Sequence, residues 1–325
     1  GLGGGLTGGL GGGLTGGLGG GLTGGLGSTN MNEALGTPVG GLGSAPIEKK
    51  QEIVDLRPKQ EPVEFNFNPL TLDKSSLTEA VAVANNYASK IDMNRLLLCF
   101  DIGGSTSDFS AMCSVRNNPA LVKQNSIKFA AQNVVKATQF CADKFKNIAL
   151  QICKENDWHL PGLNVGDNKF NADSAMFYFD QIADRLDMAK LPGFYQKIST
   201  ACQPLMITNL YVTGLIMFYA GQITRRLVQD IRNAKGEDAN PSFRPQVMLK
   251  CAGKGARVFE WLSCVDKDLA KNYFRYTYLA GIAGTIENEN VLNQNAGQFI
   301  YDVFVEDLIK GVASADIKYE VSMGL

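Results

Sequence analysis

The sequence predicts an α/β fold in which an antiparallel β-hairpin forms one edge of the sheet and a helical segment is inserted. An apolar run, Arg95 to Asp101, ends in an acid, and a glycine turn separates it from an alternating run, Phe109 to Val115. This order is typical of a buried strand, a tight turn and a returning strand. A third strand is expected at Ala120 to Phe129. A short strand at Gln246 to Lys250 leads through a second glycine turn into a helix from Arg257.

Helical periodicity dominates the chain between the third strand and the short strand. Ala130 to Asn156 repeats apolar residues at helical spacing, and a loop rich in Gly, Asn and Asp follows from Pro161 to Asp173. Further helices are expected at Ser174 to Met188, Phe194 to Pro204 and Leu205 to Arg232, and the chain beyond Arg257 is expected to be largely helical up to Ser314. The helical insert is therefore predicted at about residues 130–204.

The segment Leu205 to Ile223 is the most membrane-like stretch of the sequence. Thr208, Asn209, Thr213 and Gln222 interrupt it, and its apolar runs fall short of the span of about 20 residues that a bilayer requires. A helix buried in a protein core is the better interpretation, and no membrane partner is expected.

Residues 1–64 are predicted to be a disordered linker. Residues 1–24 are three copies of the octad GLGGGLTG, and Ser28 to Glu64 contains four prolines and a mixed charge run. Glycine gains little from burial and loses the most backbone freedom on folding, so such a repeat behaves as a flexible linker. Self-association through the periodic leucines is the alternative, although a solenoid needs a longer repeat unit. The remaining chain, about 260 residues, is enough for one large domain or two lobes.

The composition excludes several classes of function. The net charge of −1 offers no basic excess for phosphate neutralisation, so no direct nucleic-acid partner is expected. The seven cysteines form no CxxC pair, and their apolar neighbours are those of buried thiols in a reducing cytoplasm. His159 is the only histidine, which argues against a zinc site or a Ser/His/Asp triad. The start of the chain is glycine-rich and not basic then apolar, so no signal peptide is expected and the localisation is predicted to be cytoplasmic.

The segment Asp101 to Asp108, DIGGSTSD, carries the strongest chemical signal in the sequence. An acid at the end of a strand can hold a hydrated Mg²⁺, because hard cations prefer oxygen ligands. Two glycines let backbone N–H groups approach phosphate oxygens, and neighbouring hydroxyls can donate to them. The predicted phosphate-binding residues are Gly103, Gly104, Ser105 and Thr106, and the predicted metal ligands are Asp101 and Asp108, both also candidate catalytic residues. A tight hairpin with polar turn residues is the alternative.

DIGGSTSD resembles the second phosphate loop of the actin-like ATPase superfamily, which includes actin, sugar kinases and heat-shock chaperones. The family pattern is D-x-G-G-G/S-T-x-D, and every position of this segment agrees with it. The resemblance implies a ribonuclease H-like lobe that binds ATP and Mg²⁺, and it implies the C-terminal lobe of a larger bacterial protein.

Upstream, Glu79 to Ala84 resembles the first connecting helix of that family, which reads roughly E-x-x-A-x-A in the chaperones. The resemblance implies that Glu79 orients the attacking water or the metal. An ordinary alanine-rich helix is the alternative. The predicted organisation is therefore a linker at 1–64, a connecting helix at 65–95 and a nucleotide-binding lobe at 96–325.

Downstream, Val247 to Ala256 resembles the adenosine-binding turn of the family. The residues implied to bind the nucleotide there are Ala252, Gly253, Lys254 and Gly255. Two of them depart from the pattern, since Ala252 stands where Gly is usual and Lys254 where Ser or Thr is usual, which leaves open whether the turn selects adenine. Lys254 is expected to contact either a phosphate or solvent. Ala315 to Leu325 resembles the second connecting helix, with Asp-Ile in place of Asn-Pro.

The family's first phosphate loop has no counterpart in this sequence. We therefore expect a fragment cut at both ends, with the upstream lobe of the same protein as its partner and with an unknown protein partner for the whole. The intact protein is expected to be an ATPase whose hydrolysis is coupled to lobe closure, and the fragment alone is expected to be inactive. The alternatives are a nucleotide-dependent filament or scaffold protein, a small-molecule kinase and a degenerate member that does not hydrolyse ATP.

Overall fold

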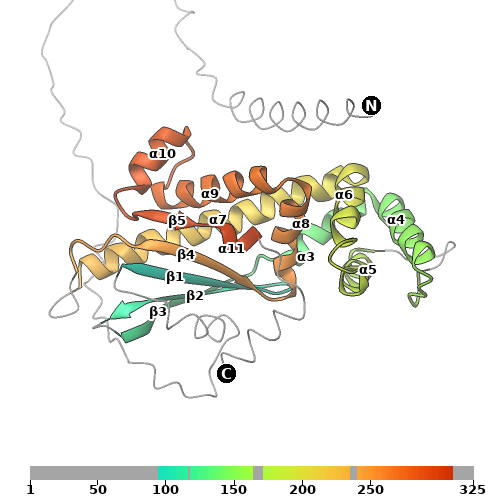
Figure 1. Cartoon of the computed structure of the whole chain (residues 1–325), viewed down its shortest axis with the longest axis horizontal. Helices are drawn as coiled ribbons and strands as arrows, with labels where there is room; N and C mark the ends of the chain where they lie inside the picture. The colour runs from blue at the N-terminus through green and yellow to red at the C-terminus, as the bar shows by residue number, and fades with distance from the viewer. Residues whose placement is uncertain (1–93, 116–117, 164–170, 235–239, 310–325) are drawn as a thin grey trace, which may run out of the picture. The chain divides into compact units, whose positions relative to one another are not determined.

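The computed structural model describes residues 94–309, apart from 116–117, 164–170 and 235–239 (Figure 1). The predicted linker at 1–64, the connecting helix that contains Glu79 and the predicted second connecting helix at 315–325 lie outside the described residues.

A five-stranded mixed sheet organises the described chain. Its strands are β1 (Arg95–Ile102), β2 (Ser107–Val115), β3 (Asn118–Ile127), β4 (Gln246–Ala252) and β5 (Asp302–Phe304), in the spatial order β3-β2-β1-β4-β5. The first three strands are antiparallel neighbours, whereas β4 runs parallel to β1 and β5 runs parallel to β4. The prediction of an α/β fold with an antiparallel hairpin at one edge of the sheet is confirmed.

The edge strand β5 is a correction to the sequence-based expectation of helix from Arg257 up to Ser314. Only three residues, Asp302–Phe304, form it, and they pair with Gln246 to Met248 of β4. A strand this short carries too few alternations for a period of two to be visible, and its partner lies far away along the chain.

Helices occupy the chain between β3 and β4 and between β4 and β5. Their bounds are α3 (Ala131–Val135), η3 (Lys136–Phe140), α4 (Ala142–Glu155), α5 (Ala172–Arg185), α6 (Leu191–Ala201), α7 (Gln203–Arg232), η5 (Lys254–Ala256), α8 (Arg257–Val265), α9 (Lys267–Ala283), α10 (Glu289–Ala296) and α11 (Glu306–Ile309). The segment Ala130 to Asn156, for which helical structure was expected, forms three helical pieces. The Thr138 hydroxyl donates to the Val135 carbonyl at 2.7 Å, and Cys141, whose φ of −149° and ψ of 29° are not helical, ends the 3₁₀ turn before α4 begins.

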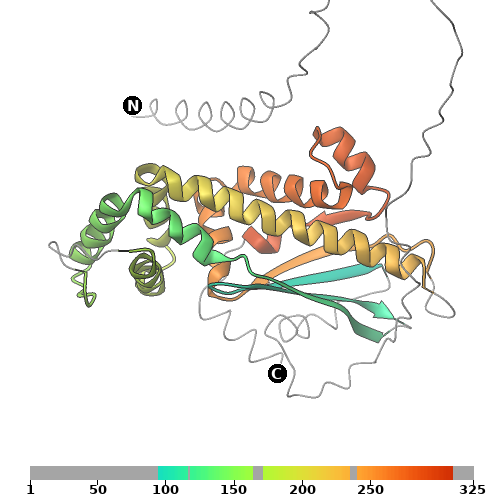
Figure 2. The ribbon, with the colours of Figure 1, turned by 180° about the vertical axis from the view of Figure 1, so that it is seen from behind.

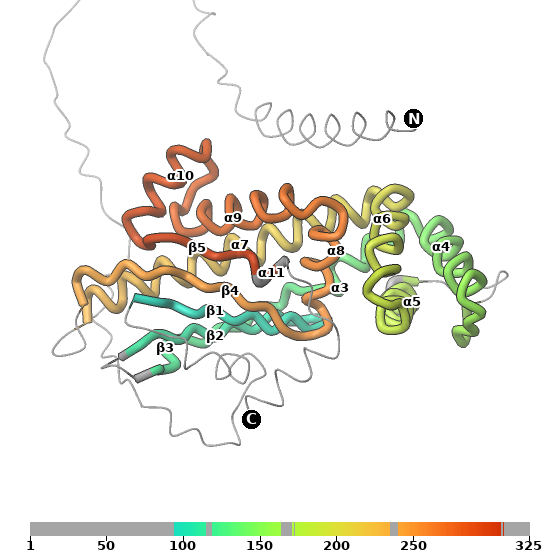
Figure 3. The backbone as a smooth tube through the Cα atoms, viewed as in Figure 1, coloured from blue at the N-terminus to red at the C-terminus, as the bar shows by residue number. Residues whose placement is uncertain are grey.

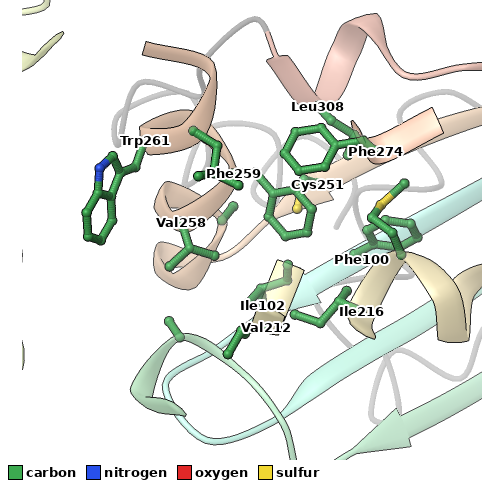
Figure 4. Packing of buried hydrophobic residues seen from close by; sticks show 14 of the residues in the cluster. Phe100, Ile102, Val212, Ile216, Cys251, Val258, Phe259, Trp261, Phe274 and Leu308 are labelled. Atoms are coloured by element: carbon green, nitrogen blue, oxygen red, sulfur yellow. The ribbon is translucent and has the colours of Figure 1, made fainter. Parts of the chain in front are cut away.

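The main core lies between the sheet and the helices α7, α8 and α9. Alternate residues of β1, including Phe100 and Ile102, point into it and meet Val212 and Ile216 of α7 (Figure 4). Because side chains alternate along a strand, Asp101 points to the opposite face of the sheet. Figure 2 shows α7 lying along the sheet with α9 beside it.

Helix α7 is long and apolar enough to cross a membrane by length and composition, and among the described residues it alone passes that test. In the structure it is a core helix with polar side chains buried at its contacts. The amide of Asn209 donates to the Val258 carbonyl at 3.0 Å, and the hydroxyls of Thr224 and Tyr278 are 2.7 Å apart. At Gly221 the backbone of α9 approaches so closely that no Cβ would fit.

Candidate functional site

The turn between β1 and β2 brings the predicted acids together. The Gly103 N–H donates to the Thr106 carbonyl at 2.9 Å and closes the β1–β2 loop, which we define as Gly103 to Thr106. Asp101 and Asp108 flank this loop as directly opposed partners of the antiparallel pair. Directly opposed side chains lie on the same face of a sheet, so the two carboxylates share one face beside the loop.

A second loop lies at the same edge, because β1 and β4 are parallel neighbours and end side by side. Ala252, the last residue of β4, is the register partner of Asp101 and is fully buried. The β4–α8 loop, which we define as Gly253 to Ala256, follows it (Figure 3). In open α/β sheets, ligands bind outside the carboxyl ends of parallel strands.

Two glycines allow the loops to touch through their backbones. Gly253 has a φ of +80°, and a Cβ there would overlap the Oδ1 atom of Asp101 and the carbonyl of Ile102. A Cβ at Gly255 would overlap the carbonyls of Ile102 and Gly103. Glycine alone combines this backbone conformation with this close approach. The carboxylate of Asp101 is therefore positioned partly by the β4–α8 loop.

Helix α5 lies beyond the end of the sheet at which β1 and β4 finish, next to both loops (Figure 1). Met176, Asp180 and Asp184 are spaced four residues apart and share one face of that helix. An ideal Cβ on Gly104 would have the Met176 methyl group at 4.0 Å as its nearest neighbour, and the two aspartates contact the β4–α8 side.

A buried arginine joins α5 to the β4–α8 loop. Arg257, the first residue of α8, is only 4% exposed, and its guanidinium is paired with Asp180 at 3.6 Å and with Asp184 in a closer contact. It also donates to the Asp180 carbonyl at 3.4 Å. Lys254 of the loop pairs with the second oxygen of Asp184 at 3.5 Å. A planar fork of donors suits such a site, because several acceptors fix its orientation.

The two aspartates respond differently to their shared partner. Burial raises the pKa of Asp180, and the charges of Arg257 and Lys254 offset this only in part. Burial also acts to raise the pKa of Asp184, but the hydrogen bond and charge of Arg257, together with Lys254, outweigh it and lower the pKa. Asp184 is thus the stronger partner of Arg257.

A second buried acid, Glu260, lies one turn beyond Arg257 in α8. The Tyr195 hydroxyl of α6 donates to it at 3.2 Å. Burial raises the pKa of Glu260 against the opposing effects of Tyr195 and Arg257, and burial followed by the charge of Glu260 raises the pKa of Tyr195. The charged cluster continues in this way from α5 through α8 to α6.

The donors at the strand ends suit Mg²⁺ better than a metal that needs a full protein cage. Among the residues that the structure describes, no group of three or more His, Cys, Asp or Glu could hold a metal ion. Mg²⁺ usually keeps several waters and is bound through one or two carboxylates plus substrate phosphates. Asp101 and Asp108 supply such a pair of carboxylates beside the β1–β2 loop.

The structure brings the predicted residues of the strand ends together, whereas Glu79 of the predicted connecting helix lies outside the described part of the chain. The β1–β2 loop residues, the two acids and the segment Ala252 to Gly255 meet at one edge of the sheet. Lys254, expected to contact a phosphate or solvent, is half-exposed and paired with Asp184.

Sequence reasoning missed the four residues Met176, Asp180, Asp184 and Arg257. The four-residue spacing on α5 is visible in the sequence as a possible helix face. The partner of that face, more than 70 residues away, is not visible there.

No protein-family model matches the sequence, and the search of curated proteins found no match. Among solved structures, a non-polymerisable quadruple mutant of pCBH ParM is similar with 12% identity and a TM-score of 0.24, over 58% of this chain and 46% of that one. An archaeal actin homologue is similar with 14% identity and a TM-score of 0.24, over 76% of this chain and 53% of that one. The chain thus spans about half the length of these two structures, and TM-scores this low carry no argument about its function.

Proposed function

We propose that this chain is a nucleotide-binding lobe of actin type, which binds ATP with Mg²⁺ at the carboxyl ends of β1 and β4. One observation carries the proposal: the DIGGSTSD turn and the β4–α8 loop, separated by more than 140 residues, are in backbone contact beside two carboxylates on one face of the sheet. A hairpin with merely polar turn residues does not require this second loop.

Each part of the site has a role in this proposal. Backbone N–H groups and hydroxyls of the β1–β2 loop would donate to phosphate oxygens, since Gly104 and Ser105 are exposed. Asp101 and Asp108 would hold the hydrated Mg²⁺, which neutralises phosphate charge when bound. The nucleoside would lie against the β4–α8 loop, where Lys254 is the exposed residue.

Hydrolysis would require groups beyond the described residues. Glu79 is the candidate for orienting water, and the second half of the nucleotide cleft would come from an upstream lobe. We propose that closure of the two lobes on the nucleotide accompanies hydrolysis in the whole protein, as in other hinged enzymes.

Calorimetric titration of the chain with ATP, with and without Mg²⁺, tests the binding proposal. The matched variants are Gly104→Val and Gly193→Val. A Cβ at Gly104 meets nothing closer than 4.0 Å, and one at Gly193 in α6 meets nothing within 4 Å. Both variants should therefore fold, but only Gly104→Val adds bulk at the phosphate loop.

We expect Mg²⁺-dependent binding that Gly104→Val abolishes and Gly193→Val preserves. The same titration on a chain that includes the upstream lobe covers the case in which this chain holds half a site. If neither protein binds, or if Gly104→Val binds as the parent does, DIGGSTSD is a structural hairpin and the proposal is wrong.

A further inference from the structure

We propose that Arg257, held by Asp180 and Asp184, is a positioning residue through which helix α5 sets the geometry of both ligand loops. This inference rests on the proposed function for its consequence, which is control of nucleotide affinity by residues that do not touch the nucleotide. Its structural part, the dependence of the loops on α5, can be tested without any ligand.

The first link joins α5 to the start of α8. Arg257 is almost fully buried, and three acceptors on α5 receive it: two carboxylates and the Asp180 carbonyl. A guanidinium held in this way has little freedom to rotate or shift. Lys254 pairs with Asp184 as well, so the same carboxylate holds one residue of the β4–α8 loop and the first residue of α8.

The second link joins the β4–α8 loop to the β1–β2 loop. Between Arg257 and the end of β4 lie only the four residues of the β4–α8 loop, and the Ala256 N–H donates to the Gly253 carbonyl at 3.0 Å. Gly253 and Gly255 pack on the Asp101 carboxylate and on the Ile102 and Gly103 carbonyls with no room for a Cβ. A shift of Arg257 is therefore expected to displace the carboxylate that the proposed function assigns to Mg²⁺.

The third link joins the β1–β2 loop directly to α5 and to α3. Met176, on the face of α5 that carries both aspartates, lies beside Gly104. The Gly104 carbonyl accepts the Gln132 N–H of α3 at 2.8 Å, which ties the loop to the helical segment. Helix α5 thus contacts one loop by packing and the other by charge.

A structural role alone would predict a different outcome. Buried ion pairs are weak contributors to stability, because desolvation offsets much of their attraction. If the cluster only helped to hold the fold together, weakening it would lower global stability without a preferential effect on the two loops.

Hydrogen–deuterium exchange of the full 325-residue chain, read by mass spectrometry, distinguishes these roles. Asp184→Asn removes the charge that both Arg257 and Lys254 contact. Glu155→Gln is the matched control, because it makes the same carboxylate-to-amide change on α4, where Glu155 pairs with Lys197 at 3.2 Å on the surface.

We expect Asp184→Asn to raise exchange about tenfold in peptides covering 101–107 and 252–257, while the β2–β3 ladder keeps its protection. Glu155→Gln should leave both loops unchanged. Equal protection of the loops in Asp184→Asn and in the parent would overturn the inference. So would a uniform rise over all peptides.

Arg257→Lys is the second variant, in case Asp184→Asn does not fold. It keeps the positive charge but loses the planar fork, so the same two loops should exchange faster; unchanged loops would overturn the inference here too. The affinity of the same variants for ATP with Mg²⁺ distinguishes the positioning role from the proposed nucleotide site. If the parent chain binds no nucleotide but the two loops of the variant exchange faster, the positioning role stands and the nucleotide site is rejected. If the parent binds ATP and a variant with faster loop exchange binds it with the same affinity, control of nucleotide affinity by Arg257 is rejected.

Discussion

The two sides of the site are built in different ways. The β1–β2 loop and its two acids come from eight consecutive residues, and strand pairing between immediate neighbours holds them. The cluster around Arg257 joins residues 73 and 77 positions apart through buried charge. The first is therefore a local motif that any hairpin of this sequence would form, and the second exists only if α5 and α8 dock correctly.

The two regions therefore have different roles in the proposed site. The local motif supplies the groups that would contact phosphate and metal, whereas the long-range cluster holds the β4–α8 loop in position. Variants in the two regions should therefore differ in kind, and the following predictions run from the largest expected effect to the smallest.

Gly253→Val should have the largest effect, because it affects both regions at once. The left-handed φ and the overlap with Asp101 together should lower the free energy of unfolding by about 4 kcal/mol. Urea denaturation measures the loss. Gly193→Ala is the control and should be neutral or stabilising by up to about 1 kcal/mol, since its Cβ meets nothing and alanine favours the helix. A stable Gly253→Val variant would show that the loops are not in contact.

Arg257→Met should have the next largest effect, because it removes the cation at the centre of the long-range cluster. It leaves Asp180 and Asp184 without their main partner, at a cost of about 3 kcal/mol in the free energy of unfolding. Arg226→Met removes an exposed i,i+4 pair with Asp230 and should cost about 0.5 kcal/mol or less. Equal losses in the two variants in urea would mean that the buried cluster does not stabilise the docking of α5.

Asp101→Asn should spare the fold and weaken only the local chemistry. We expect the affinity for ATP in the presence of Mg²⁺ to fall about tenfold, and the affinity without Mg²⁺ to change little. Titration calorimetry gives both values, and Asp143→Asn on the exposed first turn of α4 is the control. Unchanged Mg²⁺ dependence would remove Asp101 from the metal site.

The smallest effect is a pH dependence that belongs to the long-range cluster. The folded pKa of Glu260 is raised above 4.5, so its contribution to stability is complete below pH 4.5 and is lost as the pH rises through the folded value. Glu260→Gln should therefore gain stability relative to the parent between pH 4.5 and 7, by less than about 1 kcal/mol. If urea denaturation gives the same difference in free energy of unfolding between Glu260→Gln and the parent at every pH in this range, the pKa of Glu260 is not raised. The pH dependence that comes from Asp184 has the opposite sign. Because the pKa of Asp184 is lowered, this carboxylate contributes stability above pH 3.8, and the contribution is lost as the pH falls further.

Much of the sheet could be predicted, because its signals are local. The apolar run of β1, the glycine turn and the alternating run of β2 each depend on residues next to one another, and the antiparallel pairing follows from the short connection. Parallel pairing of β1 with β4 could not be predicted in the same way, since a long helical segment separates the two strands.

The sequence by itself determined the hairpin, the position of the two acids and the glycines that a close backbone approach requires. Only the tertiary structure decided that β5 adds to the sheet, that the helical segment after β3 is divided into α3, η3 and α4, and that the aspartates of α5 meet Arg257. Short-range patterns record backbone conformation and one buried face, because both depend on neighbouring residues. The partner of a buried charge depends on how distant elements pack, and no local pattern specifies that partner.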